Sequence, residues 1–432
     1  MERRGRSGKR KNLVRMLAVF CIAFAVVMAA GLSVLMGYYI MGAEEKEETK
    51  LSLFAEAIPE AGLTLPGWEP QESGEGTGLS GTEQQDSGKG EAASPAESQE
   101  SGAGEGERVS GQQSGEEVVL AFGGDILFDP GYSVMASLLQ RGRGAEGAFS
   151  QDLLEEMRAA DILMLNNEFP YSERGTPTEG KQFTFRARPD SVRLLDEMGV
   201  DIVSLANNHA FDYGETALLD TLDTLKGAGI PYAGAGVNLE EAAAPVYFTA
   251  GGMKLAYVSA TQIERMDNPD TRGATDTLPG VFRCLNPDRL LETVREAADN
   301  SDFVVVYIHW GTENVAEPDW AQLDQAPRLV EAGADLIIGD HPHCLQPVVY
   351  IDGVPVLYSL GNFWFNSRQV DTCLIKATVD GDGLKSLQFL PALQKDCFTS
   401  LLHGGEKERV LDYMRSISPG VHIDEEGYIT CP

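Results

Sequence analysis

Short apolar runs alternate with longer segments of helical periodicity from residue 118 onward. The apolar runs predict strands at 118–122, 162–165, 201–205, 254–259, 303–308 and 334–338. The segments between them predict helices at about 150–160, 190–199, 214–228, 287–299 and 319–332. Asp352-Gly353, between two further apolar runs, predicts a hairpin turn, and two more strands (372–380 and 384–391) and a helix (405–417) complete the pattern. Such alternation is typical of an α/β domain with a mostly parallel sheet.

The N-terminal pattern is different. No charged residue occurs from Met16 to Met41, roughly 26 residues, which exceeds the ~20 that cross a bilayer as a helix. Residues 1–15 are rich in Arg and Lys, which predicts a cytoplasmic tail. We therefore expect a single-pass transmembrane helix at 16–41, with the rest of the chain outside the cytoplasm. The small residues at 29–31 leave a cleaved signal peptide as the alternative.

Residues 42–115 change composition to Glu, Ser, Gly and Gln, with very few aromatic or β-branched residues. A segment of this kind cannot bury enough apolar surface to offset its conformational entropy, so we expect a disordered acidic linker. The folded domain is then expected to occupy residues 116–432.

Charge and cysteine content exclude two classes of protein. The formal net charge of −32 argues against a nucleic-acid partner, which would require a basic face. Five cysteines follow the N-terminal Cys21, without any Cys-x-x-Cys spacing. An odd number cannot pair completely within a monomer, so a disulfide framework is not expected, and a single optional disulfide is left open as the alternative.

A potential metal ligand follows each of five predicted strands: Asp125, Glu168, Asn208 with His209, His309, and His341 with His343. Carboxyl ends of parallel strands meet at one edge of a sheet, so these side chains are expected to converge. Taken singly, each has a structural explanation, such as a helix cap for Asp125. Together, carboxylate, amide and imidazole groups suit Mn, Fe or Zn. Their number predicts one or two divalent ions, and two ions would share one bridging carboxylate.

Several spaced motifs carry a family resemblance. They are Ala206-Asn207-Asn208-His209, Asp212-Tyr213-Gly214, His309-Trp310-Gly311, Gly339-Asp340-His341-Pro342-His343 and Tyr358-Ser359-Leu360-Gly361-Asn362-Phe363. In this order they resemble the CapA family of capsule or poly-γ-glutamate synthesis proteins, which is related to the calcineurin-like metallophosphatases. The resemblance spans about Val118 to Phe365 and implies a four-layer αββα sandwich.

The resemblance also implies roles for single residues. The metal ligands would be Asp125, Glu168, Asn208, His309, His341 and His343, with His209 as the catalytic residue. Glu168 would bridge two ions. Leu127 stands where the phosphatase motif Asp-x-His has its imidazole, so His343 would supply the principal nitrogen ligand of the first ion.

Two functions follow as hypotheses. The first is a metal-dependent hydrolase of phosphoester or amide bonds at the bacterial cell membrane, with its domain extracytoplasmic. Arg186 and Arg188 would bind an anionic polymer such as poly-γ-glutamate or its precursor, unless they are only solvated charges. The second is a membrane-tethered accessory protein that binds the polymer, or the synthesis and export machinery, without turnover.

Overall fold

The computed structural model describes residues 116–264 and 271–431. The predicted tail, the span at 16–41 and the linker to 115 lie outside the described residues. Within the described ranges, no helix combines the length and the apolar character needed to cross a membrane. The five described cysteines are all free thiols.

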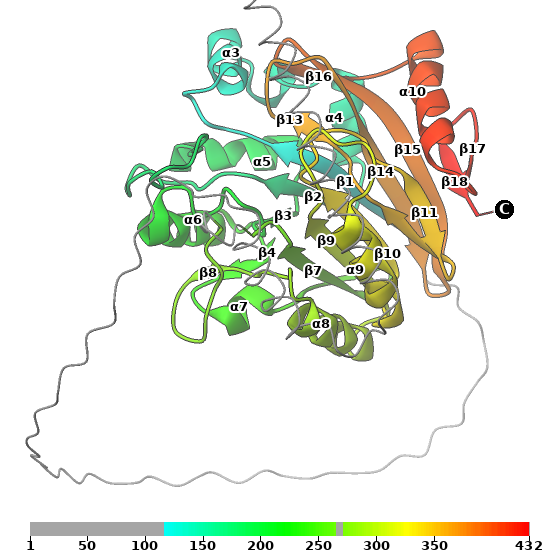
Figure 1. Ribbon diagram of the computed structural model, residues 1–432. Coiled ribbons are helices and arrows are strands. Elements are labelled where there is room, and N and C mark those ends of the chain that lie inside the picture. Colours follow the sequence, from blue (N-terminus) through cyan, green and yellow to red (C-terminus); the bar gives the residue numbers. More distant parts are fainter. Residues whose placement is uncertain (1–115, 265–270, 432) are drawn as a thin grey trace, which may run out of the picture. The chain divides into compact units, whose positions relative to one another are not determined.

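Two sheets carry most of the strands (Figure 1). The first runs in the order β17 (His422–Ile423), β18 (Tyr428–Thr430), β15 (Gly383–Lys395), β14 (Val370–Asp380), β1 (Val118–Ile126), β2 (Ile162–Asn167), β3 (Ile202–Ser204) and β4 (Tyr232–Ala233), with β13 (Asn362–Trp364) paired to β1 and β16 (Phe398–Leu401) paired to β15. The second runs β11 (Val348–Ile351), β12 (Val354–Leu357), β10 (Leu336–Asp340), β9 (Phe303–His309), β7 (Met253–Thr261) and β6 (Val246–Ala250). A small third sheet pairs β5 (Ala235–Gly236) with β8 (Gly280–Val281).

Helices connect the strands. They are α3 (Ser133–Arg141), α4 (Gln151–Arg158), α5 (Arg193–Met198), α6 (Gly214–Ala228), α7 (Leu239–Ala243), α8 (Asp288–Asp299), α9 (Trp320–Glu331) and α10 (Gly404–Ile417), with 3-10 turns η2 (Gly144–Gly147) and η3 (Pro189–Val192). The strands β1 to β4 are parallel to one another, as are β7, β9, β10 and β12. Each sheet therefore has one edge where the carboxyl ends of several strands meet.

The period of two along each strand divides the core into layers. On β9, Phe303, Val305 and Tyr307 belong to the core between the two sheets. The intervening residues of the same strand, Val304 and Val306, face a separate core under α8 and α9. A third core lies under α3 to α6 on the other face of the first sheet. Because both faces are covered, the strands read as continuous apolar runs rather than as an alternating pattern.

The predicted α/β fold class is confirmed, and the two sheets lie between helical layers as expected. Helix α6 has the predicted bounds, and most other predicted elements differ by a few residues. The prediction missed α3, whose nine residues are too few for a clear periodicity, and the short strands β6, β13, β16, β17 and β18. The first sheet is also more antiparallel than expected, because β14 to β18 pair antiparallel.

Gly124 sits where β1 approaches the segment before β13. A Cβ atom placed on Gly124 would lie 1.9 Å from the carbonyl oxygen of Gly361, and that backbone position is fixed by the Asp125 amide, which donates to the same oxygen at 3.2 Å. We expect Gly124→Ala to reduce the free energy of unfolding by about 2 kcal/mol or more, since the backbone must move to admit a methyl group. Chemical denaturation tests this, with Gly227→Ala on α6, where a Cβ meets nothing within 4 Å, as control.

Candidate metal centre

The site lies where the carboxyl ends of the two parallel strand sets face each other. Strand register places Asp340 of β10 directly opposite His309 of β9. In the other sheet, Asp125 of β1 is opposite Asn166 of β2. Four of the six histidines of the chain, His209, His309, His341 and His343, gather here. The ligand residues thus converge because parallel strands in an α/β domain end at the same edge of their sheet.

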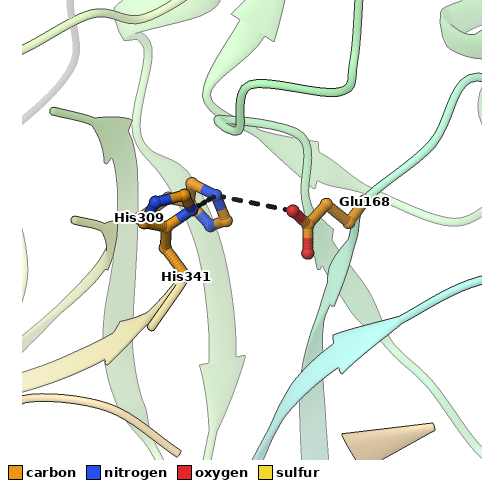
Figure 2. Close-up of side chains that lie close together, drawn as sticks. All are labelled: Glu168, His309 and His341. Carbon is orange, nitrogen blue, oxygen red and sulfur yellow. Dashed lines mark hydrogen bonds and ion pairs between the residues drawn. The ribbon is translucent and has the colours of Figure 1, made fainter. Parts of the chain in front are cut away.

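One set of ligand atoms surrounds His309; we call Asn208, His309, His341 and Glu168 the His309 cluster. His309 Nε2 lies 2.8 Å from Asn208 Oδ1, 3.0 Å from His341 Nδ1 and 3.7 Å from Glu168 Oε1. Figure 2 shows the two imidazoles side by side and the Glu168 carboxylate directed toward them. All these groups are buried.

The His309 cluster fits a divalent cation. His309 Nδ1 faces Asp340 Oδ1 at 2.8 Å, which places the ring proton on Nδ1 and leaves Nε2 as a lone pair. That lone pair faces the Asn208 oxygen, and Glu168 Oε1 has no hydrogen-bond partner in the described residues although it is buried. Buried acceptors that face one another are unfavourable without a cation or proton between them. Ligand atoms of one tetrahedral ion stand about 3.3 Å apart, close to the observed separations.

A second set, which we call the Asp125 cluster, comprises Asp125, Glu168 and His343. One ligand atom from each lies within 4.8 Å of the others. His343 Nδ1 is 3.0 Å from Asp125 Oδ2, and Asn166 Nδ2 donates to Asp125 Oδ1 at 2.8 Å. Glu168 belongs to both clusters, so one carboxylate is shared between the two candidate sites. Leu127 lines the adjoining cavity and supplies no ligand atom to this cluster.

Burial sets the ionisation of the site. It lowers the pKa of His309 to about 3 and that of His341 well below its ordinary value, the latter helped by the charge of His309. Both imidazoles are therefore neutral at pH 7, the form that binds metals. Burial, followed by the charge of Asp125, raises the pKa of Glu168 and of Asp340 well above the ordinary range. A divalent cation would relieve this crowding of carboxylates.

Backbone geometry at the His-Pro-His turn supports a site under functional constraint. His341 and His343 both have left-handed backbone angles, with φ of 93° and 57°. Such conformations cost about 1–3 kcal/mol for residues other than glycine and persist where the surroundings impose them. The turn thereby directs the His341 ring to the His309 cluster and the His343 ring to the Asp125 cluster.

Asp340 is a functional residue that the sequence motifs contained but that was not assigned a role. It is fully buried, its Oδ1 holds His309 Nδ1, and its Oδ2 has no partner within the described ranges. A carboxylate behind a ligating imidazole fixes the tautomer and the ring orientation. Asp340 is therefore a positioning residue for His309.

Replacing Asp340 by Asn should weaken metal binding by about 10- to 100-fold, because the charge behind His309 is lost while the shape is retained. Metal titration of the chelated protein measures this. Asp335→Asn, directly before the other end of β10, where Oδ2 accepts from the Val304 amide at 2.8 Å, serves as control. Equal affinities for the two variants would contradict the role of Asp340.

His209 is held by a buried charge pair. Its Nδ1 lies 2.7 Å from Asp212 Oδ2, and Lys181 Nζ lies 2.6 Å from the other Asp212 oxygen. Its Nε2 is 3.9 Å from Glu168 Oε1, so the free edge of the ring faces the Asp125 and His309 clusters. Asp212 and Lys181 were not among the predicted site residues; the Asp212-Tyr213-Gly214 motif was the available signal for the first of them.

The two predicted substrate-binding arginines lie apart from the cavity beside these histidines. The Arg186 guanidinium stacks over the Tyr213 ring at 4.5 Å, and its amide donates to Asp129. Arg188 is exposed and pairs with Asp190 at 3.2 Å. Neither lines the cavity, and their role in substrate binding stays a prediction.

A cavity of about 240 Å³ opens onto His209 and His343. Its wall includes Phe185, whose ring is 4.2 Å from that of His209, and Phe365, 4.9 Å from the His343 ring. A substrate that fills the cavity would therefore contact the histidines from the outer side. A more open depression of about 410 Å³ elsewhere is lined by Glu173, Arg174, Pro189, Asp220, Asp223 and Thr224, none of them a site residue.

Comparison with known proteins places these motifs in a family. Residues 119–367, more than half of the chain, match the model of "Bacterial capsule synthesis protein PGA_cap". The chain is similar to the capsule biosynthesis protein CapA of Bacillus anthracis (36% identity over 54% of this chain and 58% of that protein). It is also similar to the PGA biosynthesis protein CapA of Bacillus subtilis (strain 168), with 30% identity over 58% of this chain and 65% of that protein. A probable polyglutamine synthesis accessory protein of Mycobacterium tuberculosis is 29% identical over 48% of this chain and 56% of that protein. The chain thus spans about three fifths of the length of the curated relatives it matches.

Proposed function

This chain belongs to the bacterial capsule synthesis protein PGA_cap family, and from that premise we propose that it is a metal-dependent hydrolase acting in capsule or poly-γ-glutamate synthesis. The observation that carries the hydrolase proposal is the pair of ligand clusters that share Glu168, with His209 beside them. We assign it the αββα arrangement of the metallophosphatases. We also propose that residues 16–41 anchor it in the bacterial cell membrane, with the domain extracytoplasmic.

The clusters would hold one or two ions of Mn, Fe or Zn. A bound divalent ion supplies Lewis-acid polarisation and makes a water molecule more acidic. Asp125 and His343 would hold the first ion, and Asn208, His309 and His341 the second. These residues also exclude bulk water, since all but His343 are buried.

His209 would move the proton. With Nδ1 held by Asp212, its Nε2 faces the reacting groups. In hydrolysis, a water oxygen bonds to the carbonyl carbon or phosphorus and gives a proton to His209 Nε2, and this proton passes to the leaving nitrogen or oxygen as its bond breaks. Lys181 Nζ contacts the second Asp212 oxygen at 2.6 Å and so holds this carboxylate in position behind His209. The geometry supports either an amide or a phosphoester as substrate.

Removing the metal tests this function. The full-length chain, after exhaustive chelation, is expected to lose hydrolysis of γ-glutamyl amides and of phosphoesters, and to regain it on addition of Mn, Fe or Zn. The rate before and after chelation is the measurement. Undiminished hydrolysis by protein shown to be metal-free would contradict the proposal.

The accessory role is the second candidate, and Leu127 is the observation that favours it. An apolar side chain lines the cavity where the phosphatase motif has a ligand, so the Asp125 cluster has one imidazole fewer. In cells that make the polymer, a chain with both His309 and His341 replaced by Ala distinguishes the two. Normal polymer output would favour binding without turnover.

A further inference from the structure

The cavity beside His209 and His343 is lined by one exposed cation, Arg368, and one exposed anion, Glu313, whose charge also acts on His343. Within residues 116–264 and 271–431, neither the guanidinium of Arg368 nor the carboxylate of Glu313 makes an ion pair or a side-chain hydrogen bond. In a chain of formal net charge −32, an arginine left without a carboxylate at the mouth of a cavity is available to a ligand.

The loop that carries Arg368 is held in place by a buried side chain. Gln394 of β15 is fully buried, and its Oε1 accepts from the amides of Phe365 at 2.6 Å and Asn366 at 3.2 Å. Its Nε2 donates to Asn366 Oδ1 at 2.9 Å and to the Arg368 carbonyl at 3.2 Å. One glutamine thus satisfies four groups of a short loop. The backbone at Arg368 is therefore held in place before any ligand arrives, which lowers the entropic cost of ordering this loop on binding.

Glu313 is fixed from the other side. It follows the His309-Trp310-Gly311 segment, and the next residue, Asn314, has a left-handed φ of 58° and donates its amide to the Pro342 carbonyl at 2.8 Å. This bond ties the loop of Glu313 to the His-Pro-His turn. The carboxylate consequently stands at the same cavity as His343.

Aromatic side chains form the wall between the charges and the imidazoles. Phe183 is 52% exposed, although it lines the cavity, and Phe185 and Phe365 are nearly buried and in edge contact at 5.5 Å. An exposed phenylalanine at a cavity rim offers apolar surface to a ligand. The cavity thus combines charges of both signs with a short apolar wall leading to the metal centre.

We propose that this cavity binds the amino-acid end of an amide-linked chain, with its α-carboxylate on Arg368, its α-ammonium on Glu313, and its side-chain amide turned toward His209 and His343. A simple anion would be repelled by Glu313 and a simple cation by Arg368, whereas an amino-acid head group carries both charges on one carbon. Its methylene groups would lie on the aromatic wall. This assignment rests on the proposed function and adds to it which end of a γ-glutamyl chain is bound and which two residues would bind it.

Binding measured without turnover tests the assignment. Calorimetric titration of the full-length, Mn-loaded His209→Gln chain, which is expected to keep its metal while turnover falls by about 100-fold or more, compares γ-glutamylglutamate with its N-acetyl form. We expect N-acetylation to weaken binding by about 10- to 100-fold, and Arg368→Gln or Glu313→Gln to weaken binding of the free dipeptide by a similar factor. Glu313→Gln should also remove the preference for the free amine. The substitution and the N-acetylation of the ligand each remove the same interaction, that between the Glu313 carboxylate and the α-ammonium group. Arg295→Gln and Glu425→Gln, both at exposed positions away from the cavity, should bind like the parent chain.

Equal binding of the two dipeptides, or no binding by the parent chain at millimolar concentration, would overturn the assignment. Melting temperatures confirm that the variants fold, and Arg368→Lys, which keeps the charge, should recover part of the affinity. Failure of the hydrolase proposal is distinguishable. In that case the chain would bind the free dipeptide selectively but cleave neither amide nor phosphoester. Cleavage without this selectivity would support the hydrolase proposal and overturn the assignment of the cavity.

Discussion

A chain with His309 replaced by Ala is expected to lose at least ~100-fold in metal affinity, and hydrolysis with it. His309 Nε2 is the atom around which Asn208, His341 and Glu168 gather, at 2.8, 3.0 and 3.7 Å. Loss of a direct ligand should cost at least as much as loss of a residue behind one, for which 10- to 100-fold is typical. Equilibrium dialysis against Mn or Zn measures the affinity.

The matched control for that variant is His422→Ala, which removes an exposed histidine on β17. It should bind metal like the parent chain. Circular dichroism and thermal melting establish that His309→Ala is folded, since truncation also leaves buried Asp340 without its hydrogen-bond partner. A folded His309→Ala chain with unchanged metal affinity would show that the His309 cluster is not the metal site.

Replacing His209 by Gln should leave the metal in place and reduce turnover by about 100- to 10,000-fold, the usual contribution of a proton-transfer group. The ring is 3.9 Å from Glu168 Oε1 and is oriented by Asp212, so its free nitrogen is placed for proton transfer rather than at the centre of a cluster. Glutamine keeps a polar side chain of comparable length but cannot carry a proton. The rate constant at saturating substrate and the metal content are measured on the same sample.

His403→Gln provides the comparison for this variant. His403 is exposed, and its Nε2 lies 2.7 Å from Asp152 Oδ2, at hydrogen-bond distance and outside both ligand clusters. Its rate and metal content should match those of the parent chain. Loss of metal by His209→Gln would instead identify His209 as a ligand, and an unchanged rate would remove it from catalysis.

Much of the fold could be predicted because periodicity records burial. The fully apolar runs became strands buried on both faces, and α6 kept its predicted bounds. Short strands escaped prediction because two or three residues carry no periodic signal; β13, for example, is placed by pairing with β1, far from it in sequence. The same limitation applies to β17 and β18.

The ligand types at strand ends were also predictable, but the role of each individual residue was not. Asp340 and His341 are adjacent in sequence, yet one side chain stands behind His309 and the other beside it, a distinction set by the β9–β10 register and by the left-handed backbone of His341. Arg186 and Arg188 were predicted at the substrate because of their charge. The structure places Arg368 at the cavity instead, on a loop whose position depends on the buried Gln394.

The most direct test of a metal centre at this site is the metal content of the full-length chain, measured by elemental mass spectrometry after chelation, reloading with Mn or Zn and removal of free ions. The two clusters that share Glu168 predict between one and two equivalents of tightly held ion per chain, reduced by about one equivalent in His309→Ala. Background content in a folded parent chain, equal to that of the variant, would contradict a metal centre at this site.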